Sequence, residues 1–158
     1  MNILVLCTGN SARSILLECL LARLGKGRIM SFSAGSQPAG QVNPHSLTLL
    51  ERERYDVSGL RSKSWDEFAE TGAPQMDAVI TVCGSAAGET CPFWPGAPLR
   101  AHWGVEDPAA ASKHEAPAAF DQAYAILSRR AESFLAAPVE TMTATALQAH
   151  LNACGTQG

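Results

Sequence analysis

A cysteine, an arginine and a serine near the N-terminus have the spacing of an oxyanion site. In the segment Cys7-Thr8-Gly9-Asn10-Ser11-Ala12-Arg13-Ser14, five residues separate Cys7 from Arg13. A guanidinium presents a planar fork of donors that can bind two oxygens of a tetrahedral anion. A thiolate beside that anion is a nucleophile directed at the central atom. The pattern therefore predicts an anion site with Cys7 as its nucleophile.

The backbone of this segment supplies the rest of the predicted site. Gly9 permits a turn in which successive amides point inward as an anion nest, and a helix N-terminus behind it favours negative charge. These surroundings should lower the pKa of Cys7, to whose sulfur Ser14 is expected to donate a hydrogen bond. The alternative is a cysteine merely buried at a strand end. The predicted oxyanion-binding residues are Thr8, Gly9, Asn10, Ser11, Ala12, Arg13 and Ser14.

Two further cysteines occur together later in the chain. Cys83 directly follows an apolar run, and Cys91 comes eight residues later in a glycine-rich loop. Thiols in series can pass a disulfide from one to the next by exchange. The alternatives are a buried Cys83 with an incidental Cys91, or a zinc site with His102 that lacks a fourth ligand. Cys19 is interpreted as a packing residue, and Cys154 as an incidental residue of a mobile tail.

The elements that position these residues alternate along the chain. Short continuous apolar runs predict buried strands, and apolar residues three and four apart predict helices. Asn43 and Ser64 are expected N-caps, Gly25 and Gly27 should end the first helix, and Pro138 a later one. The predicted strands are 3–6, 28–34, 78–82 and 98–103, and the predicted helices are 13–24, 44–54, 64–69, 117–137 and 144–151.

This order predicts the fold class. Strands alternating with helices indicate an α/β, single-domain protein with a four-stranded, mainly parallel sheet and helices on both faces. The domain is expected to cover residues 1–138, with 139–158 as a helical tail that is part of the same domain or mobile. Because ligands bind beyond the carboxyl ends of parallel strands, Cys7 and Cys83 should meet at one edge of the sheet.

Composition limits the classes of function. The chain has 158 residues, 46% of them apolar and 17% charged, which is ordinary for one globular domain. A net charge of −3 argues against a nucleic-acid partner. There is no apolar stretch of about 18 residues and no basic leader, so we expect no membrane association and a cytoplasmic protein. In that reducing compartment, five cysteines favour redox or catalytic roles over structural disulfides.

The first loop resembles the active-site loop of low-molecular-weight phosphotyrosine phosphatases and of the arsenate reductases that share their fold. The match Cys-Thr-Gly-Asn-Ser-x-Arg-Ser is closer to the reductases. Ala12 departs from many reductases, which carry a second, non-nucleophilic loop cysteine there. The stretch Cys83 to Pro92 resembles the redox loop of thioredoxin-coupled arsenate reductases, and His102-Trp103-Gly104 and Asp107-Pro108-Ala109 resemble the segments that follow it.

The resemblance implies a role for three of the five cysteines. Cys7 attacks arsenate, Cys83 displaces arsenite by forming a disulfide with Cys7, and Cys91 resolves that disulfide. Thioredoxin is the favoured reductant, and glutaredoxin with glutathione is the alternative. Asp107 matches the general acid of both families, although on spacing alone it is better explained as a turn residue before proline.

The resemblance also bears on metals and on alternative functions. In some related reductases the positions matching Asn10, Glu18 and Ser33 help to bind potassium; a partly exposed helix glutamate is the alternative, and we predict no metal or cofactor. Phosphatases usually follow the acid and proline with tyrosine, whereas Ala109 and Ala110 stand here, which favours a small inorganic substrate. The alternative functions are a low-molecular-weight tyrosine phosphatase and a non-catalytic oxyanion-binding regulatory module.

Overall fold

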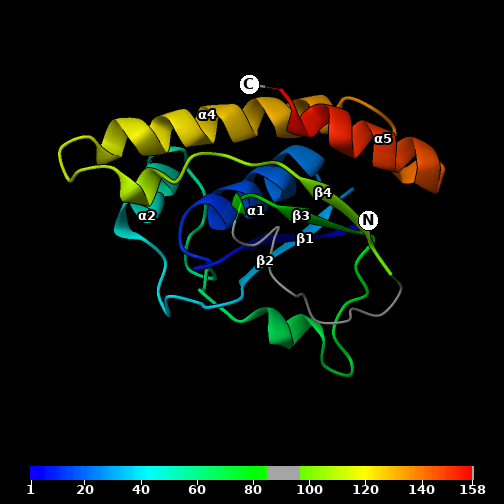
Figure 1. Cartoon of the computed structure of the whole chain (residues 1–158), viewed down its shortest axis with the longest axis horizontal. Helices are drawn as coiled ribbons and strands as arrows, with labels where there is room; N and C mark the ends of the chain where they lie inside the picture. Colours follow the sequence, from blue (N-terminus) through cyan, green and yellow to red (C-terminus); the bar gives the residue numbers. More distant parts are fainter. Residues whose placement is uncertain (85–96, 158) are drawn as a thin grey trace.

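The computed structural model describes residues 1–84 and 97–157, which form a parallel sheet covered by helices (Figure 1). The strands are β1 (Asn2–Cys7), β2 (Met30–Gly35), β3 (Ala78–Thr81) and β4 (Leu99–His102). They form one four-stranded sheet in the order β2-β1-β3-β4, and every pair is parallel. This confirms the predicted fold class.

The helices begin and end close to the predicted positions. They are α1 (Arg13–Gly25), α2 (Pro44–Arg52), α4 (Ala116–Leu135) and α5 (Ala144–Gly155), with 3-10 turns η1 (Trp65–Phe68), η2 (Pro108–Ala110) and η3 (Val139–Thr141). Asn43 caps α2 by accepting from the amide of His45 at 2.8 Å, as predicted. Helix α1 ends at Gly25, but the left-handed cap residue is Lys26, with φ 47°, rather than a glycine.

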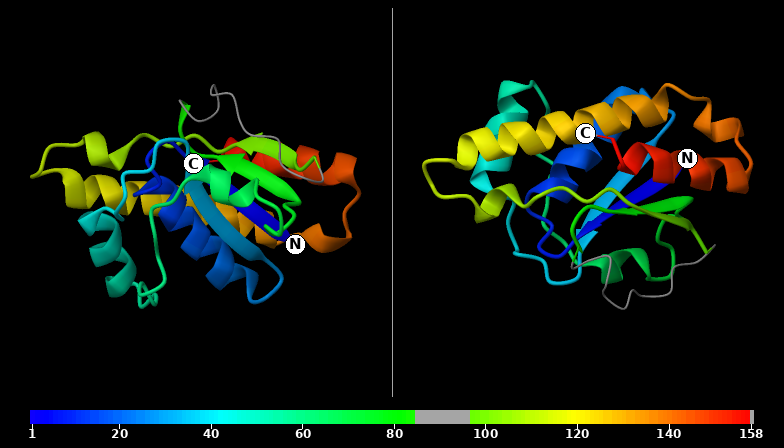
Figure 2. Two further views of the ribbon diagram at one scale, coloured as in Figure 1. Left: turned by 90° about the horizontal axis from the view of Figure 1, so that it is seen from below. Right: turned by 45° about the horizontal axis from the view of Figure 1, so that its top comes forward.

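The described α-helices pack on one face of the sheet. The larger core lies on this face and contains Ile3, Val5 and Ile80 of the strands together with Leu17 of α1 and Leu127 of α4. The other face carries a smaller cluster that includes Leu4, Leu6 and Phe68, and η1 covers it (Figure 1 and Figure 2). We expected helices on both faces. Within the described residues, the second face is covered only by the 3-10 turn η1.

The parallel arrangement places the candidate site at one edge of the sheet. Strands β1, β3 and β4 all run in the same direction, so the residues that follow them meet at their carboxyl ends. Register pairs Leu6 with Thr81 and Thr81 with His102. The first loop, Cys83 and the segment before Asp107 therefore leave the sheet side by side.

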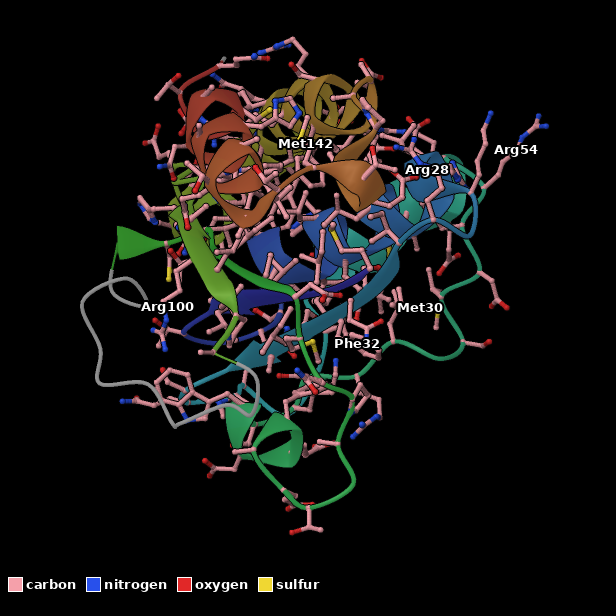
Figure 3. The ribbon with its side chains drawn as sticks, turned by 90° about the vertical axis from the view of Figure 1, so that its right-hand side faces the viewer. Arg28, Met30, Phe32, Arg54, Arg100 and Met142 are labelled. Carbon is pink, nitrogen blue, oxygen red and sulfur yellow. The ribbon has the colours of Figure 1, made fainter. Side chains whose placement is uncertain are left out.

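The C-terminal segment packs onto the rest of the domain. Three residues of α5 are buried: Leu147, Leu151 and Cys154. The expectation that Cys154 lies in a mobile tail is therefore wrong. Figure 3 shows α5 beside β4, the strand that carries Arg100, and the side-chain amide of Gln148 donates to the carbonyl of Arg100 at 2.7 Å. None of the described helices is long and apolar enough to cross a membrane.

Candidate active site

The first loop is held by its carbonyl groups. The carbonyl of Thr8 accepts from the amide of Gln37 at 3.0 Å, and that of Gly9 accepts from Ala39 at 2.9 Å. The carbonyl of Ser11 accepts from the amide of Asn43, also at 3.0 Å. Because the C=O and the following N–H of one peptide point in opposite directions, these outward carbonyls turn the next amides toward the inside of the loop. These carbonyl contacts are compatible with an anion nest, which stays a prediction.

Asn10 is the centre of the loop's polar support. It is fully buried and adopts a left-handed conformation with φ 47°, which asparagine tolerates better than most residues. Its Nδ2 donates to Ser14 Oγ at 2.9 Å and to Ser33 Oγ at 3.0 Å, and its Oδ1 accepts from the amide of Lys63 at 3.0 Å. Ser14 Oγ is thus an acceptor from Asn10, and among the described residues no hydrogen bond joins Ser14 to the sulfur of Cys7, contrary to the expectation.

Gly35, at the end of β2, lets the loop approach the sheet closely. A Cβ at this position would collide with the carbonyl oxygen of Thr8 and lie 3.1 Å from the backbone nitrogen of Asn10. The amide of Gly35 also donates to the carbonyl of Lys63 at 2.9 Å. Only a residue without a side chain fits here without moving the loop.

Cys83 lies against the nucleophile loop. Its sulfur is 3.6 Å from Thr8 Oγ1, and either of these two atoms can be the donor. Hydrogen bonding to Cys83 is the largest influence that raises the pKa of Cys7, burial raises this pKa further, and Arg13 and the amide of Thr8 act in the lowering direction. The expected low pKa of Cys7 is therefore wrong for the protein in this state, because the second thiol and burial outweigh the guanidinium.

Arg13 and Asp107 face each other across the site. Arg13 Nη1 donates to the carbonyl of Val105 at 2.9 Å, and Nη2 lies 3.6 Å from Asp107 Oδ2. Arg13 Nε is buried and has no hydrogen-bond partner within the described chain, so this donor is available to a bound oxyanion. Asp107 Oδ1 caps η2 by accepting from Ala109 at 3.0 Å. Asp107 is thus both the turn residue that spacing suggested and a carboxylate directed at the site.

Lys63 is a residue that the sequence did not indicate. Its Nζ lies 3.8 Å from Glu18 Oε1 and 3.4 Å from Ser33 Oγ, and Ser33 Oγ donates to the Glu18 carboxylate at 3.2 Å. Burial raises the pKa of Glu18 and lowers the pKa of Lys63. The charge of each group acts against the pKa shift of the other. An ammonium of the chain itself therefore lies beside the positions that the family resemblance assigned to potassium.

Cys91 lies outside the described residues, and so does the segment 85–96 that contains it. The relay role of Cys91 and its share in a zinc site stay predictions. His102 Nδ1 pairs with Thr81 Oγ1 at 2.7 Å. In the described part of the chain, no group of three or more His, Cys, Asp or Glu side chains is placed to hold a metal ion.

Comparison with known proteins identifies the family. The model of the low molecular weight phosphotyrosine protein phosphatases matches residues 2–148, and the chain belongs to this family. An arsenate reductase of Bacillus subtilis is 36% identical over 110 residues, which are 70% of this chain and 76% of the relative.

Solved structures agree with this assignment. An arsenate reductase in the phosphate-binding state superposes with a TM-score of 0.68 at 26% identity, over 85% of this chain and 96% of that one. A Corynebacterium glutamicum thioredoxin-dependent arsenate reductase has a TM-score of 0.57 at 23% identity, over 80% of this chain and 57% of that one, and shows the shared fold.

Proposed function

We propose that this protein reduces arsenate to arsenite by a relay of three cysteines. The observation that supports the proposal is the position of Cys83: its sulfur lies 3.6 Å from Thr8 Oγ1, next to the residue that must be attacked, and it raises the pKa of Cys7. A phosphatase has no use for this thiol. The arsenate reductases among the relatives support the same substrate.

The first step forms a bond between sulfur and arsenic. The loop amides and Arg13 bind the arsenate oxygens, and the Cys7 thiolate attacks arsenic. Asp107 donates a proton to the departing oxygen, which leaves as water. The product is a covalent Cys7–arsenic(V) adduct.

The second step transfers two electrons. Cys83 attacks the sulfur of Cys7, the sulfur–arsenic bond breaks, and its electron pair stays on arsenic, which leaves as arsenite. Cys91 then attacks Cys83 and frees Cys7 as a thiolate. A dithiol reductant of the thioredoxin type reduces the Cys83–Cys91 disulfide, and glutaredoxin with glutathione is the alternative donor. Since such reductants act in a reducing compartment, the proposal includes a cytoplasmic location.

The test follows NADPH oxidation with arsenate, thioredoxin and thioredoxin reductase. Wild type should turn over, and Cys91→Ser should release one equivalent of arsenite and then stop. Cys83→Ser should release none, while Cys19→Ala, a buried cysteine of α1 outside the relay, should behave as wild type. Arsenite release by Cys83→Ser in a single turnover would contradict the displacement step.

Hydrolysis of phosphate monoesters is the second candidate activity, since the same loop can bind phosphate. Ala109 and Ala110 are exposed beside Asp107, so η2 offers no aromatic wall to a phosphotyrosine ring. We therefore expect hydrolysis of a small aryl phosphate to be slower than arsenate reduction. Fast hydrolysis without arsenate reduction would favour the phosphatase, and phosphate binding without either activity would favour the regulatory module.

A further inference from the structure

Trp103 fixes the start of the segment that leads to Asp107. Its ring is fully buried, and its Nε1 donates to the carbonyl of Leu151 in α5 at 2.9 Å. The contact is close, because a Cβ on Gly155 would lie 2.6 Å from Trp103 Cδ1 and 2.7 Å from the carbonyl oxygen of His102. Helix α5 thus rests directly on the chain as it leaves β4.

Arg130 makes a second connection to the same place. It is a buried charged residue of α4, and burial lowers its pKa. Its Nε donates to the carbonyl of Gln157 at 2.7 Å, and its Nη1 donates to the carbonyl of Gly104 at 3.0 Å. One rigid guanidinium therefore joins the C-terminal end of the chain to the residue after Trp103.

The segment that follows depends on these connections. Gly104 leads into Val105, whose carbonyl holds Arg13, and then into Asp107, which faces Arg13. On its α4 side this segment borders a pocket of about 410 Å³, lined by residues such as Pro108, Ala119 and Ile126. Packing is therefore incomplete on that side, and the segment is held by hydrogen bonds: Arg130 binds the carbonyl of Gly104, and the amide of Val105 donates to the carbonyl of Val82 at 3.1 Å.

We infer that residues 144–157 are a positioning element of the active site. Through Trp103 and Arg130 they set the path of residues 104–107, and through this path they orient Asp107 and the guanidinium of Arg13. These residues touch no substrate and act only through the segment. The assignment of Asp107 as the acid rests on the proposed function, whereas the mechanical link does not.

The test compares Arg130→Met with Arg129→Met, an exposed arginine that is its neighbour on the same helix. Amide hydrogen exchange in residues 103–111 should become faster in Arg130→Met and stay unchanged in Arg129→Met and in β1. Arsenite formation in a single turnover should fall on the order of ten- to a hundred-fold in Arg130→Met alone, because small misplacements of catalytic groups are costly. Arg130→Lys should recover part of the loss.

A double variant separates positioning from general loss of stability. If Arg130 acts through the acid, Arg130→Met in an Asp107→Asn background should cost little more than Asp107→Asn alone. Full additivity of the two losses would overturn the inference. Gly155→Ala displaces Trp103 without removing a charge, because the new Cβ would lie 2.6 Å from Trp103 Cδ1. It should change hydrogen exchange and arsenite formation in the same way as Arg130→Met, and it replaces that variant if Arg130→Met does not fold.

Hydrogen exchange keeps this inference distinct from the proposed function. If wild type reduces no arsenate but exchange in residues 103–111 still depends on Arg130, the link stands and the reaction is wrong. If arsenate is reduced and neither Arg130→Met nor Gly155→Ala changes this exchange, the link is wrong and the reaction stands.

Discussion

Cys83 and Cys7 are both free thiols, and hydrogen bonding to Cys83 is the largest cause that raises the pKa of Cys7. We therefore expect the second thiol to lower the fraction of thiolate at Cys7. Since thiolate and not thiol reacts with alkylating agents, this relationship can be measured directly.

Removing Cys83 should make Cys7 more reactive. Loss of the hydrogen bond in Cys83→Ala lowers the pKa of Cys7, so more thiolate is present near neutral pH, and each unit of pKa is about ten-fold in thiolate. Alkylation of the Cys7 peptide by iodoacetamide, followed by mass spectrometry, should be several-fold faster than in wild type. Arg13→Gln should slow it, because Arg13 acts to lower the pKa. Slower alkylation in Cys83→Ala would mean that Cys83 stabilises the thiolate instead.

A methyl group at Gly35 should damage the loop. Gly35→Ala forces the carbonyl of Thr8 to move, at a cost of about 2 kcal/mol in the free energy of unfolding. Phosphate binding, measured by calorimetry, should weaken roughly ten-fold, which corresponds to about 1.4 kcal/mol. The control is Gly59→Ala, where a Cβ meets nothing within 4 Å. Equal effects of the two substitutions would exclude the close approach as the cause.

Asn10 should be sensitive both to its hydrogen bonds and to its backbone conformation. Asn10→Ala leaves the amide of Lys63 without its acceptor and places alanine at φ 47°, so we expect a loss of about 3 kcal/mol. Asn10→Gly loses the same hydrogen bonds but not the strain, and should be roughly 1 kcal/mol more stable than Asn10→Ala. Urea unfolding measures both, and identical losses would show that the left-handed conformation carries no strain.

Lys63→Met should destabilise the protein more at high pH than at low pH. Burial raises the pKa of Glu18 above its unfolded value, so ionisation of Glu18 costs stability as the pH rises through the folded pKa. Without Lys63 that pKa rises further, and the buried carboxylate is unpaired when charged. We expect a loss of about 3 kcal/mol near pH 8 and a smaller loss near pH 5, measured by urea unfolding.

The control for Lys63→Met removes both charges. Glu18→Gln combined with Lys63→Met leaves no buried carboxylate, so it should lose the dependence on pH and recover part of the stability. A loss that is the same at both pH values in the single variant would show that the Lys63–Glu18 ion pair is not its source.

Most of the fold and part of the site could be predicted from local sequence signals. The apolar runs at 3–6 and 78–82 and the cap at Asn43 appear in the structure because strand burial and capping depend on nearby residues. The strand order β2-β1-β3-β4 and the contact of α5 with Trp103 depend on long-range packing, which no local pattern contains.

The same distinction separates Cys7 from Lys63. Cys7 was found because a cysteine, a turn and a helix follow one another along the chain. Lys63 was missed because it reaches Glu18 and Asn10 from a distant loop, through the bridge between Gly35 and Ser64. The pKa of Cys7 was predicted in the wrong direction for the same reason, since Cys83 comes from another strand.

The ammonium of Lys63 bears on how the loop depends on the concentration of cations in solution. A cation taken from solution exchanges with its surroundings, and its occupancy follows the salt content of the cell. Lys63 is covalently part of the chain and partly buried beside Glu18, so its occupancy is complete at any concentration of potassium or sodium. We therefore expect the support beneath Asn10 to respond little to changes in the concentration of these ions.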